Sequence, residues 1–447
     1  MSLKSRIENL ITKPRSIAPL VIFRILFGLL MLFSLVRFLY NGWVEEFYVL
    51  PVFNFTYYGF DWLQPLPQEG MYLVFAFMIV ACILIILGWY YRWAIGTFFI
   101  LFSYVELLDK TYYLNHYYFI SLVSFILIWL PASSRFSLDI KFGRVKEITQ
   151  IPAWTIYILM FQIGVVYFFA GIAKINSDWL LEAQPLKIWL QAHTWWPVVG
   201  FLFGKEWVAY AFSWFGMIYD VTIVFFLLYS STRIWAYLAV VFFHIITGIM
   251  FPIGVFPYVM ISLTLLFFSE SFHERILTFL ERKSTPVSNH SLWFPDNFYA
   301  PLLKGFFIFY ILIQIALPFR YLAYEGPLFW REEGYRFSWR VMLMEKTGMC
   351  TFFIHEDINT PPVVIDSKKY LTPLQEHMMA TQPDMILQFA HYLETIYRNK
   401  GMSDPKVFAD CIVSLQGKRS KPFIDSTVDL SEQKRGFSPH TFILPYE

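Results

Sequence analysis

The sequence predicts an all-α polytopic membrane bundle of about nine transmembrane helices, followed by a small α+β domain outside the cytoplasm. Two observations carry this prediction. The 447-residue chain is 57% hydrophobic and only 15% charged, which is too apolar for a soluble protein of this size. Its apolar residues also lie in long runs, until the chain becomes charged and proline-punctuated in residues 319–447. We therefore expect a transmembrane domain over residues 1–318 and a separate domain over the remainder.

Nine runs qualify as candidate spans, because a membrane helix needs about 20 mostly apolar residues. They are residues 17–40, 71–91, 93–109, 114–132, 152–173, 207–230, 232–251, 253–269 and 298–318. Aromatic residues gather at several of their ends, as in Trp89–Trp93, which is typical of the membrane interface.

The loop charges predict the orientation of the bundle. With the N-terminus in the cytoplasm, the inside loops hold many more Lys and Arg residues than the outside loops, as the positive-inside rule requires. The inside residues are Lys4, Arg6, Lys13, Arg15, Arg92, Arg135, Lys141, Arg144, Lys146, Arg233, Arg275, Arg282 and Lys283, and the outside ones before the last span are Lys110, Lys174, Lys187 and Lys205. Nine spans then place residues 319–447 on the extracytoplasmic side.

The charged C-terminal part shows the patterns of a mixed domain. Residues 337–343, 350–356, 361–366 and 407–415 have the β-branched and aromatic composition of short strands. Residues 373–399 instead show helical spacing of apolar positions. We expect a small α+β domain on the outer face of the membrane.

Charge and cysteine content exclude several classes of protein. The formal net charge is +2, without the dense basic patches of nucleic-acid binders. The three cysteines show no CxxC or CxxH spacing, so we expect no metal site. Cys82 lies in an apolar run and is expected in the core. Cys350 and Cys411 can pair if they meet outside the membrane, which the sequence leaves open.

Ionisable residues inside the apolar runs are the first candidates for function, because they are costly in a membrane. An arginine or an aspartate in a span, such as Arg24 or Asp220, more often has a structural role through hydrogen bonds or ion pairs. A single histidine in a span, such as His244, is more often a core residue whose hydrogen bonds are made within the protein. Lys174, at the end of the fifth run, is by default an anchor that extends to the interface.

The predicted topology changes this view of Lys174. The fourth run begins at its outer end with Asn115 and His116, and the fifth ends there with Lys174. His244 lies roughly 10 Å below the outer end of the seventh run. His116, His244 and Lys174 are thus expected in the same outer third of the membrane, although loop charge does not show that their helices are adjacent. A desolvated lysine there can act as a base, and a lipid-soluble substrate would enter between helices.

Four segments carry a resemblance to a known family. They are "LLDKTYYLNHYYF" (107–119), "VYFFAGIAKINSDW" (166–179), "FFHIITGIMFPIGVFPYVM" (242–260) and "QIALPFRYLAYEGPLFWREEGYRFSWRVM" (314–342). Their Asn-His, AGxxK, His-containing and Ser-Trp features, in this order, resemble those of the vitamin K-dependent γ-glutamyl carboxylase family. The membrane core of that family is called the HTTM domain, and the likeness covers roughly residues 12–430.

The resemblance implies a reaction and assigns residues to it. Lys174 matches the base that deprotonates vitamin K hydroquinone, which then reacts with O2 to give a strongly basic oxygenated species. That species takes the γ-proton of a substrate glutamate, and the carbanion adds CO2. The products are γ-carboxyglutamate and vitamin K epoxide. His116 and His244 match catalytic histidines, whereas Asn115 and Tyr167 are candidates for binding the quinol.

The sequence also departs from the animal carboxylases. Ala173 stands where they have a second lysine, and "LMEKTGMCTFF" (343–353) replaces a histidine-rich run. Animal carboxylases use a longer outer region to hold a propeptide. These features resemble a short bacterial member, for which we expect the inner membrane and menaquinol as a possible quinol. Two alternatives remain: a quinol-epoxidising membrane protein without peptide carboxylation, and a non-catalytic lipid- or quinone-binding membrane protein.

Overall fold

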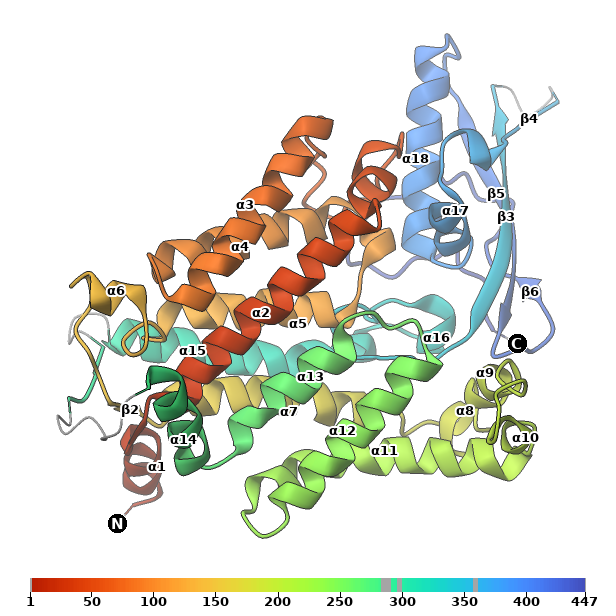
Figure 1. The fold of residues 1–447 in the computed structure, drawn as a ribbon. Helices are drawn as coiled ribbons and strands as arrows, with labels where there is room; N and C mark the ends of the chain where they lie inside the picture. The colour runs from red at the N-terminus through yellow and green to blue at the C-terminus, as the bar shows by residue number, and fades with distance from the viewer. Residues whose placement is uncertain (1, 283–290, 296–299, 357–360, 447) are drawn as a thin grey trace.

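The computed structural model describes residues 2–282, 291–295, 300–356 and 361–446, and it is mostly helical (Figure 1). Among these residues, six helical segments are long and apolar enough to cross a membrane. They are α2 (Ala18–Tyr40), α3 (Gln68–Leu87), α7 (Trp154–Ala173), α11 (Glu206–Leu228), α12 (Arg233–Met250), and α15 (Ala300–Ala316) with its 3₁₀ continuation η4 (Leu317–Ala323).

The other three expected spans are helical but do not meet the same criteria. The helix α4 (Tyr91–Leu108) is not among the six, while α5 (Asn115–Trp129) and α13 (Phe256–Thr264) with η3 (Leu265–Phe267) are apolar but shorter. The expected count of nine spans therefore stays a prediction. The last expected span, 298–318, begins at residues 298 and 299, which lie outside the described residues.

Short elements connect these helices. They are α1 (Leu3–Thr12), β1 (Pro14–Ser16), η1 (Glu45–Val49), η2 (Lys110–Tyr112), α6 (Leu138–Lys141), β2 (Gln150–Pro152), α8 (Ser177–Leu180), α9 (Leu186–Gln191), α10 (Gly200–Phe203), α14 (Glu270–Glu281) and α16 (Leu328–Arg331). The antiparallel pair β1–β2 ties the start of α2 to the start of α7.

Arg24 of α2 is fully buried and has a structural role. Its guanidinium donates to the backbone carbonyls of Ala132 at 2.8 Å, Phe136 at 2.7 Å and Ile86 at 3.4 Å. Three carbonyl oxygens compensate for the desolvation of a buried cation, which would otherwise be costly. The structural interpretation of Arg24 is confirmed, and this side chain fixes the loop after α5 against α2 and α3.

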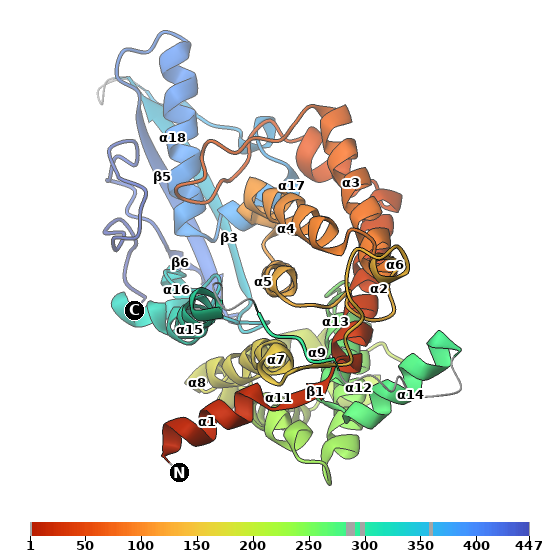
Figure 2. The same cartoon turned by 90° about the vertical axis from the view of Figure 1, so that its left-hand side faces the viewer.

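The outer domain is built on a four-stranded antiparallel sheet with the order β4-β3-β5-β6. Its strands are β3 (Lys346–His355), β4 (Val363–Val364), β5 (Lys406–Leu415) and β6 (Lys421–Pro422), accompanied by η5 (Ser367–Lys369), α17 (Pro373–Met379) and α18 (Pro383–Asn399). Figure 2 shows α18 running alongside β3 and β5, and apolar residues of α18 share one core with those two strands. This arrangement confirms a sheet-containing domain at the C-terminus.

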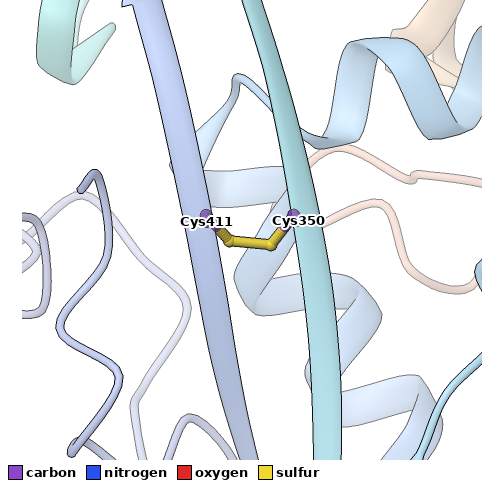
Figure 3. The surroundings of a disulfide bond; sticks show 2 residues. All are labelled: Cys350 and Cys411. Atoms are coloured by element: carbon purple, nitrogen blue, oxygen red, sulfur yellow. A yellow bond between two sulfur atoms is a disulfide. The ribbon is translucent and has the colours of Figure 1, made fainter. Parts of the chain in front are cut away.

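Cys350 and Cys411 form a disulfide across β3 and β5 (Figure 3). The two residues are directly opposite in the antiparallel register, with their Cα atoms 4.0 Å apart. The pairing that the sequence left open is therefore present. Cys82 is a buried free thiol in α3, as expected for a core residue.

The expected strand over 337–343 was wrong. This segment is irregular, and Phe337, Trp339 and Met342 all have positive φ angles. Positive φ takes the chain out of the extended region that a strand requires. The expected strands at 350–356, 361–366 and 407–415 are confirmed in β3, β4 and β5.

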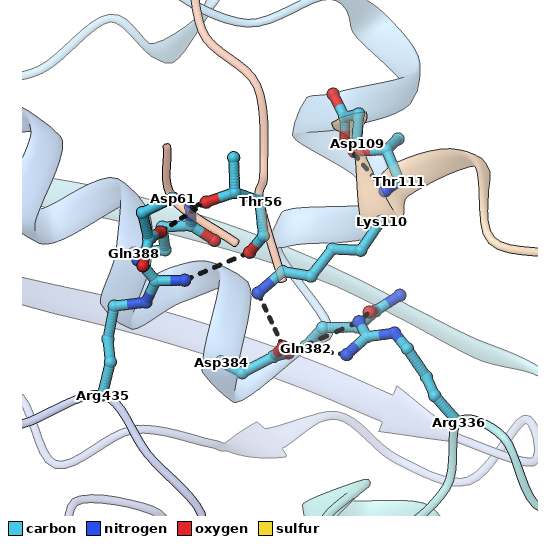
Figure 4. A network of polar contacts seen from close by, with 10 residues as sticks. All are labelled: Thr56, Asp61, Asp109, Lys110, Thr111, Arg336, Gln382, Asp384, Gln388 and Arg435. Carbon is cyan, nitrogen blue, oxygen red and sulfur yellow. Dashed lines mark hydrogen bonds and ion pairs between the residues drawn. The ribbon is translucent and has the colours of Figure 1, made fainter. Parts of the chain in front are cut away.

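A polar network joins the outer domain to the loops of the membrane domain (Figure 4). The Lys110 amine, whose side chain is only 4% exposed, lies 2.7 Å from the Asp384 carboxylate of α18. Arg336 contacts the same carboxylate at 2.8 Å. Farther along the network, Arg435 pairs with Asp61 at 2.6 Å. Two cations on one carboxylate fix α18 above the loop between α4 and α5.

Candidate functional site

A cavity of about 430 Å³ opens between α7, α11 and α12, beside the C-terminal part of α7. Its size is within the range of small-molecule sites, and most of its lining is apolar or aromatic. The polar or charged side chains in the lining are Tyr167, Lys174, Asp220, His244 and Thr247, together with the indoles of Trp179 and Trp189.

Lys174 is the C-cap residue of α7, and its amine forms a buried ion pair. Nζ lies 2.7 Å from Oδ2 of Asp220 on α11 and donates to the Ala170 carbonyl at 3.2 Å. The Lys174 and Asp220 side chains are 8% and 7% exposed. The lysine is thus held inside the cavity wall, rather than extended to the membrane interface.

A glycine in α7 explains why this ion pair can form. A Cβ atom built on Gly171 would lie 2.6 Å from the backbone nitrogen of Val221 and 3.0 Å from the carbonyl carbon of Asp220. Only a residue without a side chain allows α7 and α11 to approach this closely, as small residues do between membrane helices. The close approach brings the Asp220 carboxylate within reach of Lys174.

Tyr167 and His244 form the second polar pair of the cavity. The Tyr167 hydroxyl lies 2.8 Å from Nε2 of His244, and both residues are almost fully buried. Nδ1 of His244 has no hydrogen-bond partner among the described residues. A buried imidazole nitrogen without a partner is unusual, and in a cavity lining it can bind a polar group of a ligand.

His116 and Asn115 do not belong to the cavity lining. His116 is buried on α5, and its ring centroid lies 5.6 Å from that of Phe256, which is itself 5.7 Å from the His244 ring. Asn115 donates through its side-chain nitrogen to the backbone carbonyl of Arg340 at 2.8 Å. The structure therefore brings Lys174, His244 and Tyr167 to one cavity and leaves His116 and Asn115 behind its wall.

The cavity reaches the side of the bundle that would face lipid. Phe215 and Phe242, which line it, are 49% and 61% exposed on α11 and α12. Exposed aromatic residues on spanning helices face hydrocarbon rather than water. A lipid-soluble ligand can therefore approach between α11 and α12, in agreement with lateral entry.

Comparison with protein families identifies the membrane part first: the HTTM domain family matches residues 12–272, which is more than half of the chain. The lumenal domain family of vitamin K-dependent gamma-carboxylases matches residues 299–447. The chain belongs to the vitamin K-dependent gamma-carboxylase family. No solved structure matches it.

Membership of the gamma-carboxylase family establishes the general character of the protein. The two matches and the apolar helices indicate a membrane protein with an extracytoplasmic domain and a carboxylase-like function that depends on vitamin K. No group of three or more His, Cys, Asp or Glu in the described part of the chain could hold a metal ion.

The cavity of this gamma-carboxylase family member fits a quinol. Its walls are mainly apolar, as a fused ring system requires, and Lys174 and His244 contribute polar atoms to the lining. The unpartnered Nδ1 of His244 is one such atom. Because most of its lining is apolar, the cavity suits a lipid-soluble molecule better than a sugar or nucleotide.

Asp220 is the residue of this cavity whose partner the sequence did not identify. Its expected structural role, through a hydrogen bond or an ion pair, is confirmed by its ion pair with Lys174. The available signal was the rarity of intramembrane carboxylates, each of which needs a partner of opposite charge. The sequence alone did not say which cation that partner is, because 46 positions separate the two residues.

Proposed function

We propose that the protein is a vitamin K or menaquinone hydroquinone-dependent gamma-glutamyl carboxylase. In this reaction, epoxidation of the quinol by O2 is coupled to removal of a γ-proton from glutamate and addition of CO2. The observation that carries the proposal is the buried amine of Lys174 in an apolar cavity, beside the Tyr167–His244 pair. Family membership supports the same assignment.

Lys174 is the proposed base for the quinol hydroxyl. For this step the amine must be neutral, so the proton of the ion pair must first lie on the Asp220 carboxyl group, 2.7 Å away. The neutral amine then takes the quinol proton and becomes an ammonium. The pair is enclosed by apolar side chains, so the proton has few routes to bulk water. Once deprotonated, the bound quinol supplies the reductant for O2 and hence the strong base that glutamate chemistry needs.

Tyr167 and His244 are proposed to orient the quinol. When the Tyr167 hydroxyl donates to Nε2, the proton of a neutral imidazole is on Nδ1. Nδ1 is then a hydrogen-bond donor for a ring oxygen of the quinol. His116, through Phe256, and Asn115, through the Arg340 carbonyl, would act from behind the wall by fixing the elements that line the cavity.

The proposed partner is a glutamate-containing protein that approaches from the extracytoplasmic side. We assign residues 1–318 to the membrane domain, with the N-terminus in the cytoplasm of a bacterial inner membrane, and residues 319–447 to the domain that meets this substrate. The excess of cations in the loops on the N-terminal side supports this orientation.

The test is epoxide formation by the purified protein. Protein in detergent is supplied with reduced vitamin K or reduced menaquinone, O2, bicarbonate and a glutamyl peptide. Wild type should form quinone epoxide, and labelled bicarbonate should enter the peptide. Lys174→Ala should abolish both. Lys187→Ala, which removes a partly exposed lysine paired with Glu206, should behave as wild type.

The same assay separates the alternatives. Formation of epoxide without label in the peptide indicates a quinol-epoxidising membrane protein that does not carboxylate peptides. Saturable quinone binding without epoxide from either quinol, in wild type and Lys174→Ala alike, contradicts the enzyme and leaves a binding protein.

A further inference from the structure

The chain between α7 and α11, which loop charge assigned to the outside, carries almost no charge. Over residues 183–204, Lys187 is the only Lys, Arg, Asp or Glu. The short helices α8, α9 and α10 fold this segment against the end of α11 (Figure 1). A connection of this length that met only water would be unfavourable, because water does not solvate apolar side chains well.

Part of this segment packs on the protein. Leu190 and Phe203 are buried in an apolar cluster that includes Met250 at the end of α12. Trp189 packs against the same cluster, and its indole nitrogen donates to the Glu345 carboxylate, directly before β3, at 2.7 Å. The segment is therefore fixed on the side of the bundle that carries the outer domain.

Other residues of the same segment are apolar and exposed. Trp195, Val198 and Phe201 are 75%, 87% and 70% exposed. Leu181, near the start of the segment, is 69% exposed. A helical segment that is apolar all round is normally enclosed by apolar material, and a group of large exposed apolar side chains indicates a contact with a protein or a membrane.

Contacts with α11 favour the membrane. Tyr210 and Trp214 of α11 donate to the backbone carbonyls of Leu181 and Leu180, at 2.9 Å and 3.2 Å. Trp214 is itself 45% exposed, on a helix that is long and apolar enough to cross a membrane. The exposed face of such a helix meets lipid, so the exposed Leu181 continues a lipid-facing surface. Tryptophan is also the residue typical of the membrane interface.

The same segment forms part of the wall of the cavity that contains Lys174. Leu186 and Trp189 line this cavity together with Phe215 of α11 and Phe242 of α12. A lipid-soluble ligand that approaches between α11 and α12 therefore passes beside the segment, on the side of the outer domain.

We propose that residues 181–207 are an interfacial membrane segment, whose partner is the phospholipid leaflet on the side of the outer domain. Trp195, Val198 and Phe201 enter the acyl-chain region, whereas the exposed Lys205 stays at the headgroups. This contact does not depend on the proposed function. A second consequence does rest on it: the segment keeps the entrance of the cavity within the leaflet, so that the quinol enters from the bilayer without crossing water.

Spin labels in lipid vesicles test the membrane contact. A nitroxide is attached at Val198→Cys in a Cys82→Ala chain, which keeps the Cys350–Cys411 disulfide. The vesicles contain phosphatidylethanolamine and phosphatidylglycerol, with a water-soluble nickel chelate on both sides. The label should collide with dissolved O2 at least about tenfold more often than with the chelate, because the acyl-chain region excludes water.

A second site and a control complete this experiment. A label at Phe201→Cys should behave like the one at Val198→Cys, and both positions are exposed, so neither label disturbs the packing of the fold. A label at Ser403→Cys, on an exposed turn of the outer domain, should collide readily with the chelate. The inference is overturned if the labels at 198 and 201 meet the chelate as often as the label at 403.

Quinol kinetics test the second consequence. Phe201→Asp places a charge among the acyl chains, which is costly, so KM for menaquinol supplied in vesicles should rise at least about threefold. KM for a naphthohydroquinone without an isoprenoid tail, supplied from water, should stay as in wild type, and so should kcat. Ser403→Asp should leave both KM values unchanged. An unchanged KM for menaquinol in Phe201→Asp would overturn the role in quinol entry. Labels protected from the chelate in a protein that forms no epoxide would contradict the proposed reaction and leave the membrane contact intact.

Discussion

The amine of Lys174 and the carboxylate of Asp220 lie 2.7 Å apart between two membrane helices, although the two residues are 46 positions apart in the chain. Both side chains are almost completely buried. Removal of either charge leaves the other unpaired in a medium of low dielectric constant, where an isolated ion is costly. The pair therefore has a structural effect as well as the proposed chemical one, and the two can be separated.

A double-mutant cycle separates them. Lys174→Met and Asp220→Asn should each lower the free energy of unfolding by about 3 kcal/mol, because each leaves one buried charge. The double variant should recover much of this loss, since it buries no charge. Thermal unfolding in detergent measures stability, and epoxide formation should remain absent in the double variant. Purely additive losses would show that the two charges do not interact.

The contact at Gly171 makes a second prediction. Gly171→Ala forces α7 away from the backbone of α11, because the added Cβ would meet Val221 nitrogen at 2.6 Å. We expect a loss of about 2 kcal/mol in stability and at least a tenfold loss of epoxidation, since Lys174 moves away from Asp220. Gly164→Ala on the same helix is the control, because its Cβ would approach only a Val224 methyl group at 3.4 Å. Equal effects from both substitutions would contradict this account.

A third prediction concerns the Tyr167–His244 hydrogen bond. Tyr167→Phe removes the hydroxyl that contacts Nε2 of His244, so the imidazole loses its orientation. Quinol epoxidation should fall about tenfold, with a larger effect on KM for the quinol than for the peptide. Tyr258→Phe is the control, because Tyr258 is 59% exposed and does not line the cavity. Unchanged quinol kinetics in Tyr167→Phe would exclude the proposed role of the pair.

The network around Asp384 makes a prediction about pH. Burial alone would raise the pKa of Asp384, but the charges of Arg336 and Lys110 outweigh it and lower that pKa well below its usual range. A carboxyl group with a lowered pKa contributes stability that is present above the pKa of about 3.9 in the unfolded chain, and this stability is lost as pH falls below that value. We expect a loss of at most about 1 kcal/mol between pH 6 and pH 3, because one group with this unfolded pKa can lose little more over that range. Solvent reduces the effect, since the Asp384 side chain is 37% exposed.

Thermal unfolding of the purified protein over this pH range measures the effect. Asp384→Asn should be less stable at pH 6 and should change less on acidification than wild type. Asp366→Asn, at an exposed aspartate, should follow the wild-type curve. An identical pH dependence in Asp384→Asn and wild type would show that another group is responsible.

Sequence patterns predicted the parts of the molecule that depend on local composition. Long apolar runs indicated the helices, and loop charge together with helical rise placed Lys174 and His244 at one level of the membrane. The partner of Lys174 was not predictable in this way. Periodicity describes each helix separately and does not show which helices are neighbours. Segment 337–343 was misassigned because composition does not report backbone angles, and the positive φ angles of Phe337, Trp339 and Met342 exclude an extended strand.

The Cys350–Cys411 bond is expected to form only after the outer domain has left the cytoplasm. A thiol pair in the cytoplasm is kept reduced, whereas the same pair outside meets oxidising conditions. The two central strands are therefore joined only on the side where the domain is meant to work. Formation of this cross-link is thereby tied to translocation of the outer domain, and a chain inserted in the reverse orientation would keep free thiols at both positions.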